Sequence, residues 1–260
     1  MSVSSPSIAE LRAATQPESI FARNSGEHWA GRLYMRRLSP YLTRQLLRTG
    51  ISPNGVTWMM IWYGLAAAAA LSGPGLVWAV VAVLLIQVQL LLDCSDGELA
   101  RWIQQKSPVG VYLDRIGHWL TEAALPIALG VRADGGWDEL GTYTALGLVI
   151  AVLVLLIKGE SALVTVARAE SGLPPAGDTR AVAAPRASGL RRLRRAAGML
   201  PFYRAFVAME ATLLALAAAI VDAVGGDLDG SRTLVVALVV VAAITASGHL
   251  LAILTSDRLR

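Results

Sequence analysis

Residues 93–118 read DCSDGELARWIQQKSPVGVYLDRIGH and place acidic side chains between two long apolar stretches. Asp93 and Asp96 are three residues apart, so on a helix they share one face. Asp114 and His118 are four apart and share a face of the next helix. Three carboxylates that converge repel one another unless a cation lies between them, and Mg²⁺ or Mn²⁺ prefers such oxygen ligands. The spacing therefore favours a metal site over a solvated acidic loop, which does not account for Asp114 inside an apolar segment.

The composition around this segment excludes a soluble enzyme. Of 260 residues, 55% are hydrophobic and only 16% are charged, with a mean hydropathy of +0.53. Soluble domains carry about 25% charged residues, so this chain cannot cover its surface with polar groups. The net charge of +4 comes from arginines beside apolar blocks. That distribution indicates anionic lipid headgroups as the partner and argues against nucleic acid.

Six apolar segments have roughly the 20-residue length of a bilayer crossing. They cover residues 53–72, 75–93, 109–131, 139–166, 202–224 and 232–254. The third is the least hydrophobic because it carries ionisable side chains, among them Asp114 and Glu122. The sequence therefore predicts an all-α, integral membrane bundle of six transmembrane helices.

The rest of the chain divides around these spans. Residues 1–25 are rich in Ser, Pro and Ala and predict a flexible N-terminal tail. Residues 26–49 interleave leucines with arginines, which predicts an amphipathic interfacial helix kinked at Pro40; a soluble partner-binding helix is the alternative. Residues 50–257 form one six-span domain, in which 168–200 is a flexible cytoplasmic connector.

Loop charges predict the orientation in the membrane. Eighteen Lys and Arg lie in the two termini and in the loops after the second and fourth spans, against two, Arg132 and Arg232, on the opposite side. Cytoplasmic loops carry the excess of positive charge. The chain is therefore expected to be a multi-pass protein of the plasma or inner membrane, with both termini and the site cytoplasmic.

The segment resembles the signature of the CDP-alcohol phosphotransferases, Asp-x2-Asp-Gly-x2-Ala-Arg-x8-Gly-x3-Asp-x3-Asp. Seven of its eight positions match with the right gaps: Asp93, Asp96, Gly97, Ala100, Arg101, Gly110 and Asp114. The eighth position, an Asp in the family, is His118 here. In addition, Asn54 and Thr57 open the first span and are similar to the Pro-Asn-x-x-Thr found there in many members.

The resemblance implies an activity and the residues that carry it. The family displaces CMP from a CDP-linked donor by attack of an acceptor hydroxyl, with Mg²⁺ or Mn²⁺ held by residues similar to Asp93, Asp96 and Asp114. Positions matching Asn54, Thr57, Gly97, Ala100, Arg101 and Gly110 line the nucleotide site. The partners implied are a CDP-linked donor, a hydroxyl acceptor such as a phosphorylated polyol, membrane lipids and a second copy of the chain in a homodimer.

Three ionisable residues have more than one interpretation. His118 can take the acceptor's proton as a general base, since a neutral imidazole has a reference pKa near 6.5. It can also bind metal or have no catalytic role. Lys158 in the fourth span can grip a phosphate group or reach the membrane surface. Glu122, four residues after His118, can orient the imidazole or pair with a neighbouring span.

The leading functional hypothesis is a phosphotransferase of phospholipid or inositol-phosphate-type lipid synthesis. A small multi-pass transporter is the second, because intramembrane ionisable residues can form an ion path. A catalytically inactive homologue is the third, and it rests on His118. The donor and acceptor stay open, although Glu98 within the signature is similar to members that handle inositol phosphates.

Overall fold

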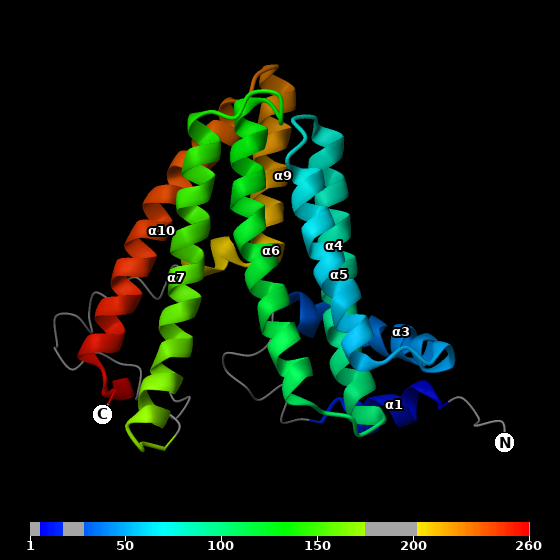
Figure 1. Cartoon of the computed structure of the whole chain (residues 1–260). Coiled ribbons are helices and arrows are strands. Elements are labelled where there is room, and N and C mark those ends of the chain that lie inside the picture. Colours follow the sequence, from blue (N-terminus) through cyan, green and yellow to red (C-terminus); the bar gives the residue numbers. More distant parts are fainter. Residues whose placement is uncertain (1–5, 18–28, 175–201, 260) are drawn as a thin grey trace. The chain divides into compact units, whose positions relative to one another are not determined.

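The computed structural model describes residues 6–17, 29–174 and 202–259, and every regular element in these ranges is helical (Figure 1). The all-α prediction is confirmed for this part of the chain. Most of the expected connector at 168–200 lies outside the described residues.

A long helix forms at each of the six apolar segments. They are α4 (Pro53–Leu71), α5 (Leu76–Trp102), α6 (Pro108–Asp134), α7 (Thr142–Glu170), α9 (Ala208–Gly225) and α10 (Asp229–Thr255). Within the described ranges four of these, α5, α7, α9 and α10, are long and apolar enough to cross a membrane. In α6, ionisable side chains such as Asp114, His118 and Glu122 lower the hydropathy. The count of six spans stays a prediction.

Helix boundaries differ most from the predicted spans at two places. Helix α5 continues nine residues beyond the predicted end at Asp93, so the first half of the signature is helical throughout. The fifth span was predicted from residue 202, but a short 3-10 helix, η2 (Phe202–Phe206), precedes α9. Apolar length alone does not locate these ends because polar residues continue the helix in α5.

The expected tail at residues 1–25 is wrong for Ile8–Thr15, which form helix α1. Ser7 and Glu10 make a capping box: the Glu10 carboxylate accepts from the Ser7 backbone N–H at 2.8 Å, and Ser7 Oγ accepts from the Glu10 N–H at 3.2 Å. The Ser7 backbone N–H and the Ser7 hydroxyl, which donates to the same carboxylate at 2.8 Å, lower the pKa of Glu10. Leu11 and Thr15 are buried, so packing supports a helix too short to be stable alone.

A π-helical turn, η1 (Gly31–Met35), leads into α3 (Arg36–Thr49), and Pro40 lies inside α3. Proline has no N–H for the carbonyl four residues earlier, which here belongs to Arg36. The side chain of Gln16 donates to that carbonyl at 2.8 Å. The missing backbone bond is thus replaced by Gln16, directly after α1, and the helix is not broken at Pro40. An interfacial position for this helix stays a prediction.

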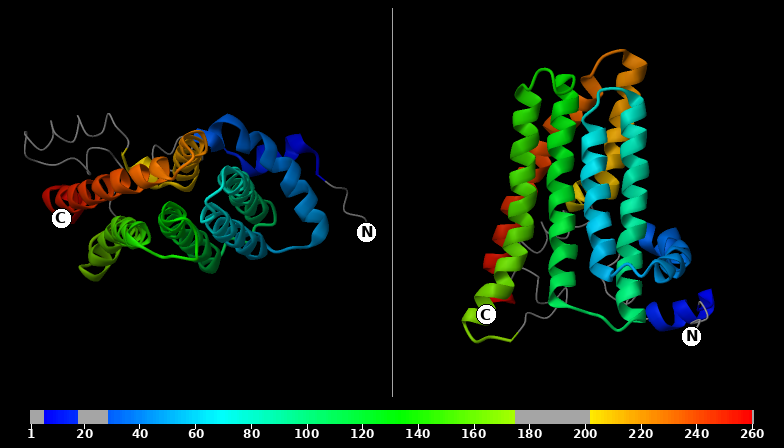
Figure 2. Two further views of the ribbon diagram at one scale, coloured as in Figure 1. Left: turned by 90° about the horizontal axis from the view of Figure 1, so that it is seen from above. Right: turned by 45° about the vertical axis from the view of Figure 1, so that its right-hand side comes forward.

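The chain divides into two compact units. Unit 1 contains residues 1–67 and 82–121, and unit 2 contains residues 68–81 and 122–260. The core of unit 1 gathers Leu46 of α3, Val56, Met60 and Ile61 of α4, and Leu92 and Leu99 of α5. Figures 1 and 2 show α1 and α3 beside the C-terminal end of α5. All of the signature therefore lies in unit 1.

Arg132, one of the two basic residues assigned by sequence to the outer side of the membrane, is fully buried in unit 2. Arg132 donates to the Gly73 and Gly75 carbonyls at 2.6 and 3.1 Å and to Ser231 Oγ at 3.0 Å. Its Nη2 lies 3.7 Å from Asp222 Oδ2. This arginine joins α6 to the turn before α5, to Asp222 in the last turn of α9 and to Ser231 in the first turn of α10.

Candidate active site

Two helices with the same kind of N-terminus position the site. Ser107 Oγ accepts from the Gly110 N–H at 3.0 Å, and Pro108 is the first residue of α6. Ser52 Oγ accepts from the Gly55 N–H at 3.1 Å, with Pro53 opening α4. A serine cap followed by proline suits a helix start, because proline has the helical φ and no N–H left to satisfy. Both starts are therefore set by local sequence.

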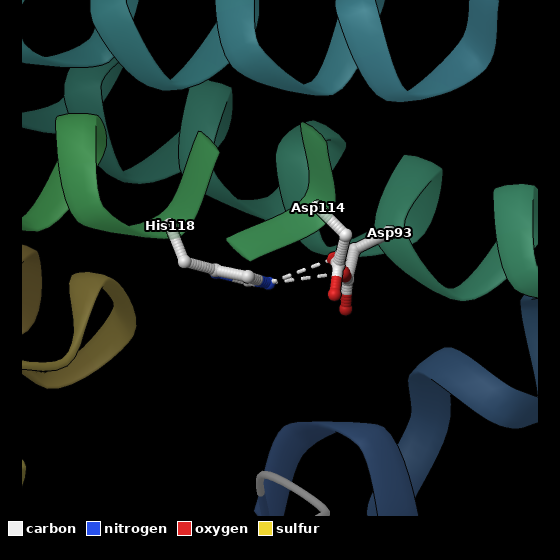
Figure 3. Close-up of side chains that lie close together, drawn as sticks. All are labelled: Asp93, Asp114 and His118. Atoms are coloured by element: carbon white, nitrogen blue, oxygen red, sulfur yellow. Dashed lines mark hydrogen bonds and ion pairs between the residues drawn. The ribbon is translucent and has the colours of Figure 1, made fainter. Parts of the chain in front are cut away.

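Helices α5 and α6 bring Asp93, Asp114 and His118 together (Figure 3). His118 Nε2 lies 3.1 Å from Asp93 Oδ1 and 3.5 Å from Asp114 Oδ1. One ligand atom from each of the three lies within 4.8 Å of the others. All three are partly exposed, so a small ligand can reach them. We refer to these three residues as the acid–imidazole cluster.

Asp96 is held apart from this cluster. It is 8% exposed, and its Oδ2 accepts from Thr57 Oγ1 at 2.7 Å. The same hydroxyl lies 3.1 Å from the Pro53 carbonyl oxygen. Of the three predicted metal ligands, the structure therefore groups Asp93 with Asp114, adds His118, and places Asp96 against the start of α4. Thr57, predicted to bind nucleotide, positions this carboxylate.

The signature glycines lie where another group approaches closely. A Cβ added at Gly97 would be 3.1 Å from Nη1 of Arg101, and one at Gly110 would be 3.0 Å from Asn54 Oδ1. The space beside Gly97 is thus taken by the Arg101 guanidinium. Its Nε donates to the Thr15 carbonyl at 2.6 Å. Ala100 is partly buried in the turn before Arg101.

Glu98 occupies a position that the signature leaves open, and it is fully buried. Its carboxylate accepts from Ser39 Oγ at 2.5 Å, Thr43 Oγ1 at 2.8 Å and Gln16 Nε2 at 2.8 Å. A buried charge requires such partners. Glu98 therefore joins α5 to α1 and α3. In the sequence, only the family likeness points to Glu98. No sequence pattern indicates its partners. The helix α1 that precedes Gln16 does have a signal, because Ser7-x-x-Glu10 is a capping box.

Lys158 and Glu122 form an ion pair in unit 2, with Nζ 2.9 Å from Oε2. Of the two interpretations of Glu122, the structure favours pairing with a neighbouring helix. A phosphate-binding role for Lys158 stays a proposal.

The acid–imidazole cluster fits a divalent cation. Two carboxylates supply the hard oxygens that Mg²⁺ and Mn²⁺ prefer, and the imidazole adds a nitrogen ligand that favours transition metals. Asp93, Asp114 and His118 would therefore hold the metal, and the nitrogen shifts the preference from Mg²⁺ toward Mn²⁺ and later metals.

Long apolar helices, one of which joins α6 in bringing the acid–imidazole cluster together, define the class as a membrane protein. The family model of the CDP-alcohol phosphatidyltransferases matches residues 50–221, and the chain belongs to this family. A relative, the archaetidylinositol phosphate synthase of Aeropyrum pernix, is 38% identical over 132 residues. That match covers 49% of this chain and 63% of the relative's length.

Proposed function

We propose that this protein transfers a substituted phosphate group from a CDP-linked donor to an acceptor hydroxyl and releases CMP. The acid–imidazole cluster carries the proposal, because it gathers family signature residues from two helices in a geometry suited to a cation. An acidic loop with no function would not bring Asp93 and Asp114 within reach of one imidazole.

In the proposed reaction, the acceptor oxygen bonds to the distal phosphorus of the donor while the bond from that phosphorus to CMP breaks. A divalent cation at the cluster would neutralise charge growing on the leaving diphosphate oxygen. Arg101 presents guanidinium N–H groups that match phosphate oxygens. The Asp96 carboxylate, which accepts from Thr57, is a further member of the proposed metal-ligand set.

His118 is proposed to receive the acceptor's proton when its Nε2 is not bound to metal. The 3.1 Å approach to Asp93 would stabilise the imidazolium that forms. When Nε2 is a metal ligand, it has no lone pair for a proton. Nε2 therefore cannot act as a general base and as a metal ligand at the same time, and the two roles predict different effects of substitution.

For substrates, we propose a lipid-linked donor such as CDP-diacylglycerol and a phosphorylated polyol acceptor. The name of the Aeropyrum pernix relative supports an inositol phosphate acceptor. Asn54, Gly97, Ala100, Arg101 and Gly110 are proposed to line the nucleotide site. Lys158 would add a phosphate contact if substrate releases it from Glu122.

The membrane arrangement is proposed as six spans, with both termini and the site in the cytoplasm and two copies forming a homodimer. The segment 26–49 is proposed to lie along the membrane surface. Family membership and the distribution of arginines support this arrangement.

The test is mass spectrometry of products after the purified protein is offered CDP-diacylglycerol or soluble CDP-alcohols with inositol phosphate or glycerol phosphate. We expect CMP and a new phosphodiester, both absent in an Asp93→Asn variant. Substrate uptake into vesicles without CMP release would instead indicate a transporter. Metal-dependent CDP binding without turnover would indicate an inactive homologue.

A further inference from the structure

The N-terminal helix α1 contacts the signature helix α5 at two points. Gln16, directly after α1, donates its Nε2 to Glu98 Oε1 at 2.8 Å and to the Arg36 carbonyl at 2.8 Å. The Thr15 carbonyl at the end of α1 accepts from Arg101 Nε at 2.6 Å. Both points lie within the stretch that the family signature covers.

Glu98 is an anchor for this contact. Besides Gln16, it is bonded by Ser39 and Thr43 of α3, and Arg36 Nη1 lies 3.7 Å from its Oε1. A carboxylate without solvent exposure tolerates little displacement of these donors, because each lost bond leaves buried charge unsatisfied. The end of α1 is therefore fixed relative to α5.

The Arg101 guanidinium is fixed by the same contact. Its Nη1 lies 3.1 Å from the position of a Cβ added at Gly97, so a side chain there would displace the guanidinium slightly, and its Nε donates to the Thr15 carbonyl. Its Nη2 is buried and has no hydrogen-bond partner among the described residues. A buried guanidinium N–H without a partner is costly, and a phosphate oxygen that displaces the atoms covering Nη2 would satisfy it.

We propose that α1 is a positioning element of the nucleotide site: anchored to Glu98 through Gln16, it orients Arg101 so that Nη2 can bind a phosphate of the CDP-linked donor. This inference rests on the proposed function. Because the Arg101 guanidinium is already held in its binding geometry, its side chain loses less conformational entropy when the donor binds. Gln16 and Glu98 are positioning residues, since they act through Arg101.

The test compares CDP with cytidine, which lacks phosphates, by calorimetry on the full-length protein in detergent with Mn²⁺. We expect Gln16→Ala to weaken CDP binding by about tenfold, the scale of one hydrogen bond to a charged group, and to leave cytidine binding unchanged. Gln16→Glu should weaken it further by placing a second carboxylate against Glu98. Gln45→Ala, an exposed glutamine of α3, is the matched control.

Two further variants separate positioning from loss of fold. The exchange Gln16→Glu with Glu98→Gln keeps one amide and one carboxylate and should recover much of the CDP affinity. Ser7→Ala weakens α1 at its cap, away from the site, and should cause a smaller loss in the same direction. Equal loss of CDP and cytidine binding, or unchanged CDP binding in Gln16→Glu, would overturn the inference. Wild-type protein that binds no CDP would overturn the proposed function itself.

Discussion

His118 replaces a carboxylate with an imidazole at the position where the family signature ends. From the next turn of α6 the imidazole reaches both carboxylates, with Nε2 3.1 Å from Asp93 Oδ1 and 3.5 Å from Asp114 Oδ1. It changes the charge of the cluster, since a neutral imidazole brings none. A cluster with two charges in place of three attracts Mg²⁺ less strongly and gains a ligand suited to transition metals.

The two carboxylates should be essential to activity. Asp93→Asn and Asp114→Asn replace a charged ligand with a neutral amide, so we expect turnover to fall by roughly 10²-fold or more with weaker Mn²⁺ binding. CMP release and Mn²⁺ electron paramagnetic resonance measure the two effects. Asp138→Asn, an exposed acid outside the signature, is the control. Full activity of either variant in EDTA would contradict a metal-dependent reaction.

His118 variants should distinguish its roles. His118→Ala is expected to lose roughly 10²–10⁴-fold in turnover, the scale for a general base, and His118→Asp should recover part of it. If the imidazole binds metal, the Asp variant will also show a lower ratio of Mn²⁺ to Mg²⁺ activity than wild type. An unchanged ratio with lost turnover identifies the base. Turnover of the alanine variant within about threefold of wild type would exclude both roles.

At the level of elements, the sequence predicts those parts of the site that depend on local spacing. Asp93 and Asp96 are on one helix and Asp114 and His118 on another, as the three- and four-residue intervals indicate. The pairing of these helices could not be derived from spacing, because it depends on tertiary packing. The separation of Asp96 by Thr57 was missed for the same reason.

Helix α1 shows a second limit of sequence patterns. The eight residues of α1 have no apolar period, and the Ser7-x-x-Glu10 capping box is their one sequence signal for a helix; such a short helix is marginal in isolation. It forms because Leu11 and Thr15 are buried and Gln16 reaches Glu98, 82 residues further along the chain. Long-range contacts of this kind leave no periodicity to read.

Asp134, the last residue of α6, caps the start of α7, which lies several residues further along the chain. Its carboxylate accepts from the backbone N–H groups of Gly141, Tyr143 and Thr144 at 2.8, 3.2 and 2.7 Å. Burial acts to raise the pKa of Asp134, but these bonds and the Thr144 hydroxyl outweigh it, so the pKa is lowered. Gly141 at the helix N-cap has no side chain to do this.

Asp134→Ala should therefore destabilise the protein by about 1 kcal/mol, the usual cost of losing a helix cap. Because the folded-state pKa is lowered, the stabilisation is present above the ordinary aspartate pKa and is lost as the pH falls through the folded value. Thermal unfolding of wild type and variant should therefore converge in acid. A difference in stability that stays constant from neutral pH to the acid range would contradict this account.

Arg132 should be the most sensitive residue in unit 2. Arg132→Leu would leave Asp222 and two carbonyls buried without their partner, so a loss of about 3–5 kcal/mol is expected. Arg232→Leu is the control, because that arginine is 40% exposed and pairs with the exposed Asp229. Thermal unfolding in detergent measures both. Equal effects of the two variants would show that burial of Arg132 does not determine its importance.

For the whole molecule, the burial of Arg132 sharpens the topology argument. This residue is one of only two basic groups assigned to the outer side, and it is engaged with Asp222 inside the protein. Arg232 is then the one remaining basic residue assigned to the outer side, against eighteen in the termini and the loops predicted to be cytoplasmic. Since basic residues in short loops set the orientation, the arrangement should be uniform across molecules.

Cysteine labelling at the two ends of α7 tests this orientation. In a variant whose buried Cys94 is replaced by alanine, Ser171→Cys follows the end of α7 and Asp138→Cys precedes its start, and both positions are exposed. Because α7 is long and apolar enough to cross a membrane, the two thiols should lie on opposite sides. A membrane-impermeant maleimide applied to intact cells should modify only Cys at 138, and Cys at 171 should react only after the cells are opened. The reverse pattern would place the signature outside the cell and would contradict the orientation predicted from the basic residues. Labelling of both positions in intact cells would show that α7 does not cross the membrane.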